Sequence, residues 1–240
     1  MIKIKISDSE ENRDVIKYVR ETITANADDL LLDKTETDGG KRVGIVFTCR
    51  AEYSDFIRCQ AENAIADAIA VKYKYDYFGR NLKPFGLDKL QTEILYAALI
   101  SADIEDDERY ITRKIRVFDE YAIDGIFNFR LAALKRKWSE IVGYIPTYFN
   151  EERLRDFVGY LVGEKKGRKA RVENGEVFAP DFGVLKRTEL AGGSGIGRIV
   201  REVILSACGE VDVATEIPEE DARYIKDYYG SRAKFLYLKR

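Results

Sequence analysis

A glycine-rich segment is where residue types and spacing come closest to a ligand-binding motif. Residues 191–198 read Ala-Gly-Gly-Ser-Gly-Ile-Gly-Arg, after a possible strand and before a predicted helix. Free backbone N–H groups at the start of a helix can bind a phosphate. The residues that would do so are Gly193, Ser194, Gly195 and Arg198. The spacing matches neither the dinucleotide-binding fingerprint nor the Walker motif, so a flexible loop leading into the helix is the preferred interpretation.

Basic side chains supply a second candidate site. Positive charges are concentrated in one short segment that contains Lys165, Lys166, Arg168, Lys169 and Arg171. Together with Arg130 they could contact a phosphate backbone, and such binding would weaken steeply with salt. The alternative is that these residues form a solvated loop and helix face.

Asn128 and Arg130 form a third candidate site, close together on one predicted helix. The planar fork of Arg130 can bind a carboxylate or a phosphate of a partner. The alternative is that both side chains cap or pair with neighbouring elements of the same chain.

Other chemistries are disfavoured by the residue types present. The chain has no histidine, which removes Ser-His-Asp and Cys-His nucleophiles and His-ligated zinc sites. The isolated Cys49, Cys59 and Cys208 argue against a disulfide framework and fit a reducing compartment. The acidic residues 103–108 could attract a hard cation, but the dipole of a helix that starts there explains them more simply. We therefore predict no catalytic residue, no metal site and no cofactor.

Residues 72–78 interleave lysine with tyrosine, as single-strand nucleic-acid binders do. On a helix, however, Tyr73, Tyr75 and Tyr77 point in different directions and form no stacking platform. We predict that they pack in and around the core.

The composition is that of a soluble globular protein. The chain has 240 residues, of which 45% are hydrophobic and 34% charged, with a formal net charge of −2. Such a charge gives no general attraction to nucleic acid or to an anionic membrane. No apolar run approaches the roughly 20 residues that span a bilayer, and the alternating Lys and Ile at the N-terminus do not resemble a signal peptide.

The hydrophobic pattern predicts a predominantly helical α+β fold. In residues 1–49, apolar and charged residues first alternate as in a strand, and apolar residues then recur at helical spacing. Two further strand-like runs follow, joined by a turn at Asp38-Gly39-Gly40, so this segment predicts a small β-α-β-β unit. Helical spacing dominates residues 50–163, which predict a central bundle: one long helix over 51–78, two helices over 87–98 and 104–118, and a last one over 154–161. Residues 164–240 predict an α/β unit, with a hairpin at Asn174-Gly175.

The bundle is organised around one predicted helix, which extends from residue 123 to 145. Its inward stripe consists of Phe127, Leu131, Leu134, Trp138, Ile141 and Ile145. Asp124 is placed to cap its first turn, and Pro146 ends it.

The same central stretch carries a resemblance to a protein family. Ile123 to Leu131 resembles the signature of the YtxC family, named for a role in sporulation. The helix over 154–162, the hairpin after it, and the segment Val203 to Cys208 with the strand, helix and strand that follow are also similar. The resemblance covers roughly residues 50–240. It implies a cytoplasmic protein linked to sporulation, without an established biochemical activity or catalytic residues.

Our expectation is therefore a non-enzymatic module that acts by binding another protein, of unknown identity. The alternative is a nucleic-acid or nucleotide-binding module that uses the basic segment 165–171 or the glycine-rich loop Gly192 to Gly197. An enzyme that uses carboxylates, lysine or tyrosine is a third, weaker hypothesis, since it lacks the commonest general base.

Overall fold

The computed structural model describes residues 1–165, 167–181 and 183–239. The chain is a predominantly helical α+β protein with two small mixed sheets in the described part, which confirms the predicted fold class. The backbone divides into two compact units, each made of two stretches of chain. Unit 1 is Met1–Lys74 with Glu105–Ile141, and unit 2 is Tyr75–Ile104 with Val142–Arg240. The segments 1–49, 50–163 and 164–240 do not coincide with these units, because helices of the middle segment are shared between the two.

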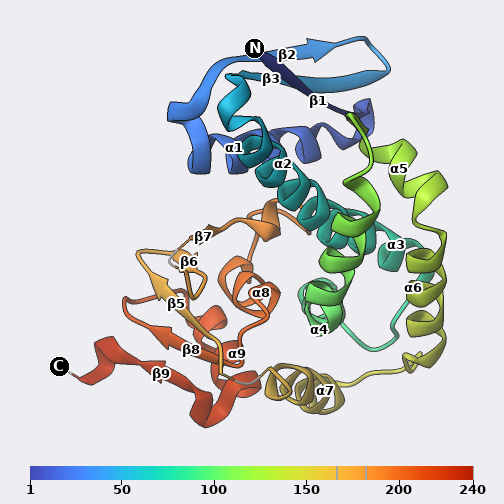
Figure 1. Cartoon of the computed structure of the whole chain (residues 1–240). Helices are drawn as coiled ribbons and strands as arrows, with labels where there is room; N and C mark the ends of the chain where they lie inside the picture. The colour runs from blue at the N-terminus through green and yellow to red at the C-terminus, as the bar shows by residue number, and fades with distance from the viewer. Residues whose placement is uncertain (166, 182, 240) are drawn as a thin grey trace. The chain divides into compact units, whose positions relative to one another are not determined.

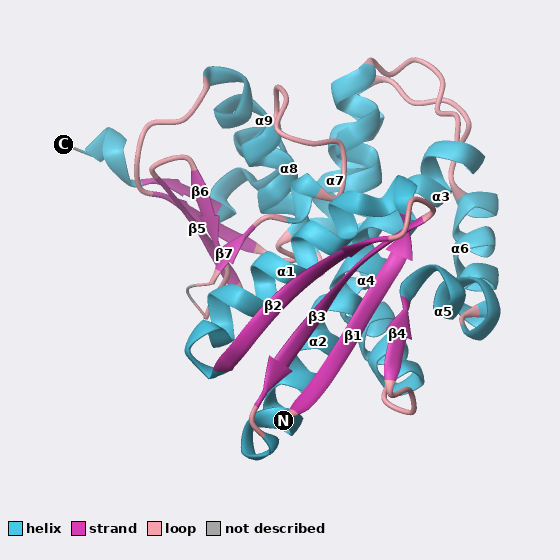
Figure 2. Ribbon diagram, turned by 90° about the horizontal axis from the view of Figure 1, so that it is seen from above, coloured by secondary structure: helices cyan, strands magenta, loops and turns pink. Residues whose placement is uncertain are grey.

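Unit 1 contains a four-stranded sheet in the order β2-β3-β1-β4, which Figure 2 shows from above. Its strands are β1 (Ile2–Ser9), β2 (Leu31–Asp38), β3 (Arg42–Cys49) and β4 (Glu120–Ala122). Helix α1 (Arg13–Ala27) links β1 to β2, and β3 lies between these strands and antiparallel to both. This is the predicted β-α-β-β unit, and Gly40 (φ 77°) forms its turn. The parallel partner β4, which pairs Tyr121 with Ile6, was not predicted.

One face of this sheet is buried in a hydrophobic core. Ile4 and Ile6 of β1 have at most 1% exposure, and Ile45 and Phe47 of β3 are fully buried. Residues of a strand alternate between faces, so Asp8 continues the inward row of Ile4 and Ile6. Asp8 is also fully buried, which places a carboxyl group where the sequence pattern calls for an apolar side chain.

The long helix predicted over 51–78 contains a change of helix type. Helix α2 (Ser54–Ala68) continues as a π-helical turn over Ile69–Tyr73 and then as α3 (Lys74–Asn81). The π-turn shifts the side chains that follow around the axis, and such turns often occur at functional sites. Tyr73 is its last residue and Lys74 the first of α3.

The two helices predicted over 87–98 and 104–118 are confirmed, and they follow each other directly across a kink. Helix α4 spans Lys89–Ile115, and the non-helical residue Asp103 (φ −134°, ψ 20°) marks a kink inside it.

The prediction of a single helix over 123–145 is wrong in one respect, because the helix is interrupted in the middle. Helix α5 (Ile123–Arg130) ends at Leu131, whose backbone is not helical (φ −108°, ψ 32°), and α6 (Ala132–Tyr144) begins directly afterwards. Leu131, Leu134 and Trp138 are buried, as predicted. The break was not visible in the sequence because the apolar spacing continues across it. The N-cap of α5 is Ala122, so the predicted N-cap position of Asp124 is also wrong. Asp124 lies in the first turn, and its carboxylate accepts from the backbone N–H groups of Gly125 and of Asp124 itself.

Unit 2 contains a five-stranded sheet in the order β7-β6-β5-β8-β9 (Figure 1). Its elements after residue 150 are α7 (Glu151–Gly163), β5 (Lys169–Glu173), β6 (Glu176–Phe178), β7 (Val184–Leu185), α8 (Arg198–Leu205), β8 (Glu210–Val213), α9 (Glu219–Tyr229) and β9 (Ala233–Phe235). The predicted hairpin is confirmed: β5 and β6 pair antiparallel around Asn174 (φ 51°) and Gly175 (φ 78°). β8 is parallel to both β5 and β9. None of the helices in the described part of the chain is long and apolar enough to cross a membrane.

Candidate functional site

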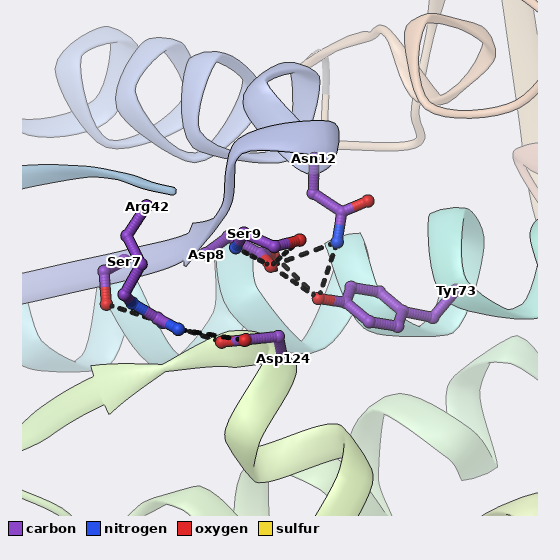
Figure 3. Close-up of polar contacts among 7 residues, drawn as sticks. All are labelled: Ser7, Asp8, Ser9, Asn12, Arg42, Tyr73 and Asp124. Carbon is purple, nitrogen blue, oxygen red and sulfur yellow. Dashed lines mark hydrogen bonds and ion pairs between the residues drawn. The ribbon is translucent and has the colours of Figure 1, made fainter. Parts of the chain in front are cut away.

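A buried polar cluster lies at the carboxyl end of β1 (Figure 3). The Asp8 carboxylate accepts hydrogen bonds from the backbone N–H of Ser9 (2.7 Å), from Nδ2 of Asn12 (3.0 Å) and from the hydroxyl of Tyr73, which lies 2.8 and 2.9 Å from its two oxygens. Asn12 also donates to the Tyr73 hydroxyl (3.1 Å). We call Asp8, Asn12 and Tyr73 the Asp8 cluster. It ties the end of β1 to the π-turn that ends at Tyr73.

The partners of Asp8 in this cluster are uncharged, and this determines its ionisation. Burial raises the pKa of Asp8, the hydrogen bonds from Asn12, Tyr73 and Ser9 only partly oppose the effect, and the nearby charge of Asp124 adds to it. Burial also raises the pKa of Tyr73, and the charge of Asp8 raises it further. Tyr73 is therefore a neutral hydrogen-bond donor.

A second carboxylate beside β1 is bound by a cation. Arg42 at the start of β3 donates from both terminal nitrogens to Asp124, at 2.9 and 2.7 Å, and also to the hydroxyl of Ser7 (3.1 Å) (Figure 3). The hydrogen bond with Arg42 keeps the pKa of Asp124 below its usual value, against the opposing effect of burial. This pair connects the first turn of α5 to the sheet.

Another buried carboxylate belongs to α4. Asp107 is 1% exposed and accepts from Nζ of Lys74 (2.8 Å), Nζ of Lys137 (2.6 Å) and Nε1 of Trp138 (2.9 Å). We call these four residues the Asp107 cluster. Burial by itself raises the pKa of Asp107, but the charge of Lys74 and the hydrogen bonds from Lys137, Lys74 and Trp138 outweigh it, and the pKa lies below its usual value. Asp107 is thus a carboxylate held in its ionised form.

The two clusters meet at the inner side of α5. The ring of Phe127 lies 4.6 Å from the ring of Tyr73 and 5.7 Å from the ring of Trp138, measured between centroids. Tyr73 belongs to the Asp8 cluster and Trp138 to the Asp107 cluster. Phe127 is therefore held between two hydrogen-bonded side chains, which fixes the position of α5.

The outer side of α5 is exposed. Asn128, Phe129 and Arg130 are consecutive and all exposed, and Phe129 keeps 83% of its surface in solvent. The guanidinium of Arg130 lies over the ring of Phe118 (5.7 Å), whose neighbour Val117 is 78% exposed. We call these five residues the α5 surface. The predicted binding residues Asn128 and Arg130 thus lie beside an exposed aromatic side chain that the sequence analysis did not single out.

The glycine-rich loop encloses a side chain of its own chain. The buried guanidinium of Arg201 donates to the carbonyls of Ala191 (2.8 Å) and Gly193 (2.8 Å) and lies 3.2 Å from the Glu93 carboxylate. A Cβ at Gly192 would lie 2.3 Å from Arg201 Nη1. Carbonyl oxygens that surround a cation do not provide a site for an anion. This arrangement favours a structural role for the loop.

The remaining residues predicted to bind an anion lie apart from that arginine. Ser194 and Gly195 are exposed. Arg198 donates to the carbonyl of Gly175 in the hairpin turn. The side chain of Arg198 is therefore directed to the hairpin turn, whereas the carbonyl of Gly193 faces Arg201.

The basic segment is largely neutralised by acceptors within unit 2. Lys165 donates to the carbonyl of Ala102 (2.8 Å), Lys169 lies 3.2 Å from Asp212, and Arg171 donates to Glu173 (2.9 Å). Hydrogen bonding to Asp212 raises the pKa of Lys169, and hydrogen bonding to Glu173 raises that of Arg171. Arg168 is exposed, and Lys166 lies outside the described residues. Paired cations attract a phosphate backbone less than free ones.

Asp8, Lys74 and Asp107 are the site residues that sequence reasoning missed, although a signal was present. Two of them stand at positions where the periodicity points into the core: Asp8 after Ile4 and Ile6, and Asp107 between Ile104 and Ile111. A charged residue in phase with the apolar stripe indicates a buried partner. Within the described part of the chain, no group of three or more cysteine, aspartate or glutamate side chains is placed to hold a metal ion.

The chain was compared with protein families, with curated proteins and with solved structures, and none of the three comparisons found a match.

Proposed function

We propose that this protein is a non-enzymatic interaction module of the YtxC type, cytoplasmic and linked to sporulation, which binds a protein partner through the α5 surface. The observation that carries the proposal is the exposure of Phe129, which is 83%. Phe129 lies on α5, whose inner residue Phe127 packs between Tyr73 and Trp138. Large aromatic side chains and arginines dominate the binding energy of protein interfaces. The sporulation link and the location rest on the resemblance of Ile123 to Leu131 to that family.

Two features of the α5 surface suit it to binding. First, Arg130 is held over the ring of Phe118, so less conformational entropy is lost when its fork binds a carboxylate. Second, Phe127 is fixed on the inner side of the same helix between Tyr73 and Trp138. A contact surface ordered before binding loses less free energy on association.

A non-enzymatic role is supported by the burial of the acidic groups. Asp8 and Asp107 have 0% and 1% exposure, so a substrate does not reach either carboxylate in this structure. Their hydrogen bonds connect parts of unit 1 to one another, which is the role of a structural network.

The proposal is tested by isolating the tagged protein from its own cells during sporulation and identifying what co-purifies. Phe129→Ala and Arg130→Ala should each lose the partner, with a dissociation constant raised about 30-fold for a hot-spot residue. Arg130→Lys keeps the charge but loses the fork, so it should weaken binding too. The matched control is Tyr160→Ala, another exposed aromatic residue (65%), in α7. Equal recovery of partners with Phe129→Ala and with the control would refute the proposed surface.

The alternative, a nucleic-acid-binding module, is the weaker candidate because Lys165, Lys169 and Arg171 already have acceptors. It predicts binding to nucleic acid at low salt that is lost when Lys165, Lys166 and Arg168 are changed to Glu. Absence of binding at low salt would remove this alternative.

A further inference from the structure

The sheet of unit 1 ends in a long free edge. Strand β2 pairs with β3 on one side and is the outermost strand of the order β2-β3-β1-β4. From Leu32 to Asp38 every residue of β2 is exposed. Figure 2 shows β2 at the border of the sheet, opposite the short β4. An edge strand of this length offers unpaired backbone groups to another strand.

The hydrogen bonds at the turn determine which residues of β2 offer these groups. The N–H of Gly39 donates to the carbonyl of Arg42 (2.9 Å), and hydrogen-bonded and non-hydrogen-bonded pairs alternate along an antiparallel ladder. The pairs Thr37 with Gly44 and Thr35 with Val46 are therefore the hydrogen-bonded ones. The backbone groups of Lys34, Glu36 and Asp38 point away from β3, toward the free edge.

We propose that two copies of this chain associate through β2, as antiparallel strands with Thr35 opposite Thr35 of the second copy. Their two sheets then form one continuous sheet about a twofold axis. In this register Lys34 lies opposite Glu36 of the second copy, and Glu36 opposite Lys34. Both pairs consist of residues whose backbone groups point outward, as hydrogen bonding across the edge requires.

The charges of β2 select this register among the neighbouring ones. Since only Lys34, Glu36 and Asp38 direct backbone groups outward, a symmetric antiparallel pair must be centred on a residue. If the twofold axis passes at Lys34 or at Glu36, that residue lies opposite the same residue of the second copy. If the axis passes at Thr37, Glu36 lies opposite Asp38 of the second copy. Like charges directly opposite each other are unfavourable, whereas opposite charges are favourable. Centring on Thr35 gives two opposite-charge pairs and no like-charge pair.

The present partners of these side chains do not prevent this association. Lys34 pairs with Asp28 (2.6 Å), and Glu36 with Arg20, at partly exposed positions. Ion pairs of this kind contribute little and can be shared or exchanged. Arg13 of α1 likewise pairs with Asp38 (2.8 Å), and a groove of about 260 Å³ is lined by Arg13 and Lys17 of α1 together with Glu36 of β2. Charges on an edge strand usually prevent pairing; here Lys34 and Glu36 are opposite in sign, which suits a second copy in this register.

Charge reversal with sedimentation analysis tests the proposal. The wild type should form a dimer in the micromolar to millimolar range. Lys34→Glu and Glu36→Lys should each raise the dimer dissociation constant at least about tenfold, because attractive pairs become repulsive. The double variant, which exchanges the two charges, should restore the dimer. A mixture of the two single variants should associate, since one variant carries two acidic side chains at positions 34 and 36 and the other carries two basic ones.

A cross-link tests the register independently of charge. In a chain whose exposed Cys59 is changed to Ser, Thr35→Cys should form a symmetric disulfide under mild oxidation. Directly opposite residues of a non-hydrogen-bonded pair have Cα atoms about 4.5 Å apart, which a disulfide can bridge. Thr37→Cys is the control, since it faces Asp33 of the second copy and should remain unlinked. A monomeric wild type, single reversals that leave the dimer unchanged, or equal cross-linking at Thr35 and Thr37 would each overturn the proposal.

Discussion

Two buried carboxylates of unit 1, Asp8 and Asp107, resemble each other in burial and differ in their partners. Asp8 is surrounded by the neutral donors Asn12 and Tyr73, and Asp107 by the cations Lys74 and Lys137. Burial raises the pKa of both groups, but it prevails only at Asp8, whereas the two lysines lower the pKa of Asp107. The comparison shows that the charge of the partners, more than burial, decides whether an enclosed carboxyl group is held ionised.

The two clusters nevertheless serve the same element. The ring of Tyr73 from one and the ring of Trp138 from the other both contact Phe127 of α5. One cluster supports this helix through neutral hydrogen bonds and the other through a buried ion pair. Substitutions should therefore affect the two sides of α5 by different amounts and with different dependence on pH.

The largest effect is expected from Asp107→Asn. It removes the carboxylate charge that offsets the ammonium of Lys74, a side chain with 0% exposure. Breaking a buried ion pair from one side costs about 3–5 kcal/mol in the free energy of unfolding, measurable by urea denaturation. The control Lys137→Met removes a side chain that is 40% exposed and should cost clearly less. Equal losses for the two variants would mean that Asp107 is not the centre of this cluster.

A smaller loss is expected from Tyr73→Phe. The ring that packs on Phe127 remains, but Asp8 loses the hydroxyl donor 2.8 Å away, and a buried acceptor without its donor costs about 1–3 kcal/mol. Tyr77→Phe, at a half-buried tyrosine in α3, is the control and should have less effect. If Tyr73→Phe unfolds at the same urea concentration as the wild type, the hydroxyl does not contribute to the Asp8 cluster.

Asp8→Asn should change stability by about 1 kcal/mol or less at pH 7, because the amide oxygen still accepts hydrogen bonds and no charge is buried. Its effect should depend on pH. The pKa of Asp8 is raised in the folded protein above the value of 3.8, so the stability that Asp8 contributes is present below about pH 4 and is lost as the pH rises through the raised pKa. The free energy of unfolding of Asp8→Asn should therefore increase relative to that of the wild type as the pH rises.

Asp107→Asn should show the opposite dependence on pH. The pKa of Asp107 is lowered on folding, so its contribution is present above about pH 4 and is lost as the pH falls through the lowered pKa. The difference between wild type and Asp107→Asn should therefore shrink in acid. Unfolding curves of both variants and the wild type over a pH series give, for each variant, the dependence on pH of its difference in stability from the wild type. The same sign of this dependence for Asp8→Asn and Asp107→Asn would contradict the comparison.

The smallest effect on folding is expected on the outer side of α5. Phe129→Ala removes a side chain that is 83% exposed and should change the free energy of unfolding by less than about 0.5 kcal/mol, while it raises the dissociation constant of the partner about 30-fold. Thermal unfolding measured beside the binding assay separates the two effects. A loss of stability as large as that of Tyr73→Phe would mean that Phe129 belongs to the core.

Much of the fold could be predicted from the sequence, because local residue patterns determine many of its strands, helices and turns. The alternation of Ile2 to Ile6, the turn at Gly40 and the hairpin at Asn174 each depend on neighbouring residues alone. β4 could not be predicted, because three residues give no pattern and its partner β1 lies more than a hundred residues earlier in the chain. The break at Leu131 was missed because the apolar spacing continues across it. The π-turn was missed because Val71, Tyr75 and Phe78 have the spacing of an uninterrupted helix in the sequence.

The candidate site was predicted less completely, for a physical reason. Asn128 and Arg130 were singled out because exposed polar residues are visible in a helical pattern. Asp8 and Asp107 are recognisable as charges in core positions. Their partners Tyr73 and Lys74 are the last residue of a π-turn and the residue directly after it, and the sequence does not reveal how that turn changes the direction of side chains. Which donor meets which carboxylate depends on tertiary packing.

The most direct measurement is an NMR titration of the side-chain carboxyl groups, with Asp8 and Asp107 assigned by comparison with Asp8→Asn and Asp107→Asn. The structure predicts that Asp8 takes up its proton at a pH above the ordinary aspartate value of 3.8, and Asp107 at a pH below it. The reverse order, or one common midpoint for both groups, would contradict the conclusion that α5 is held between a carboxyl group with neutral partners and one with cationic partners.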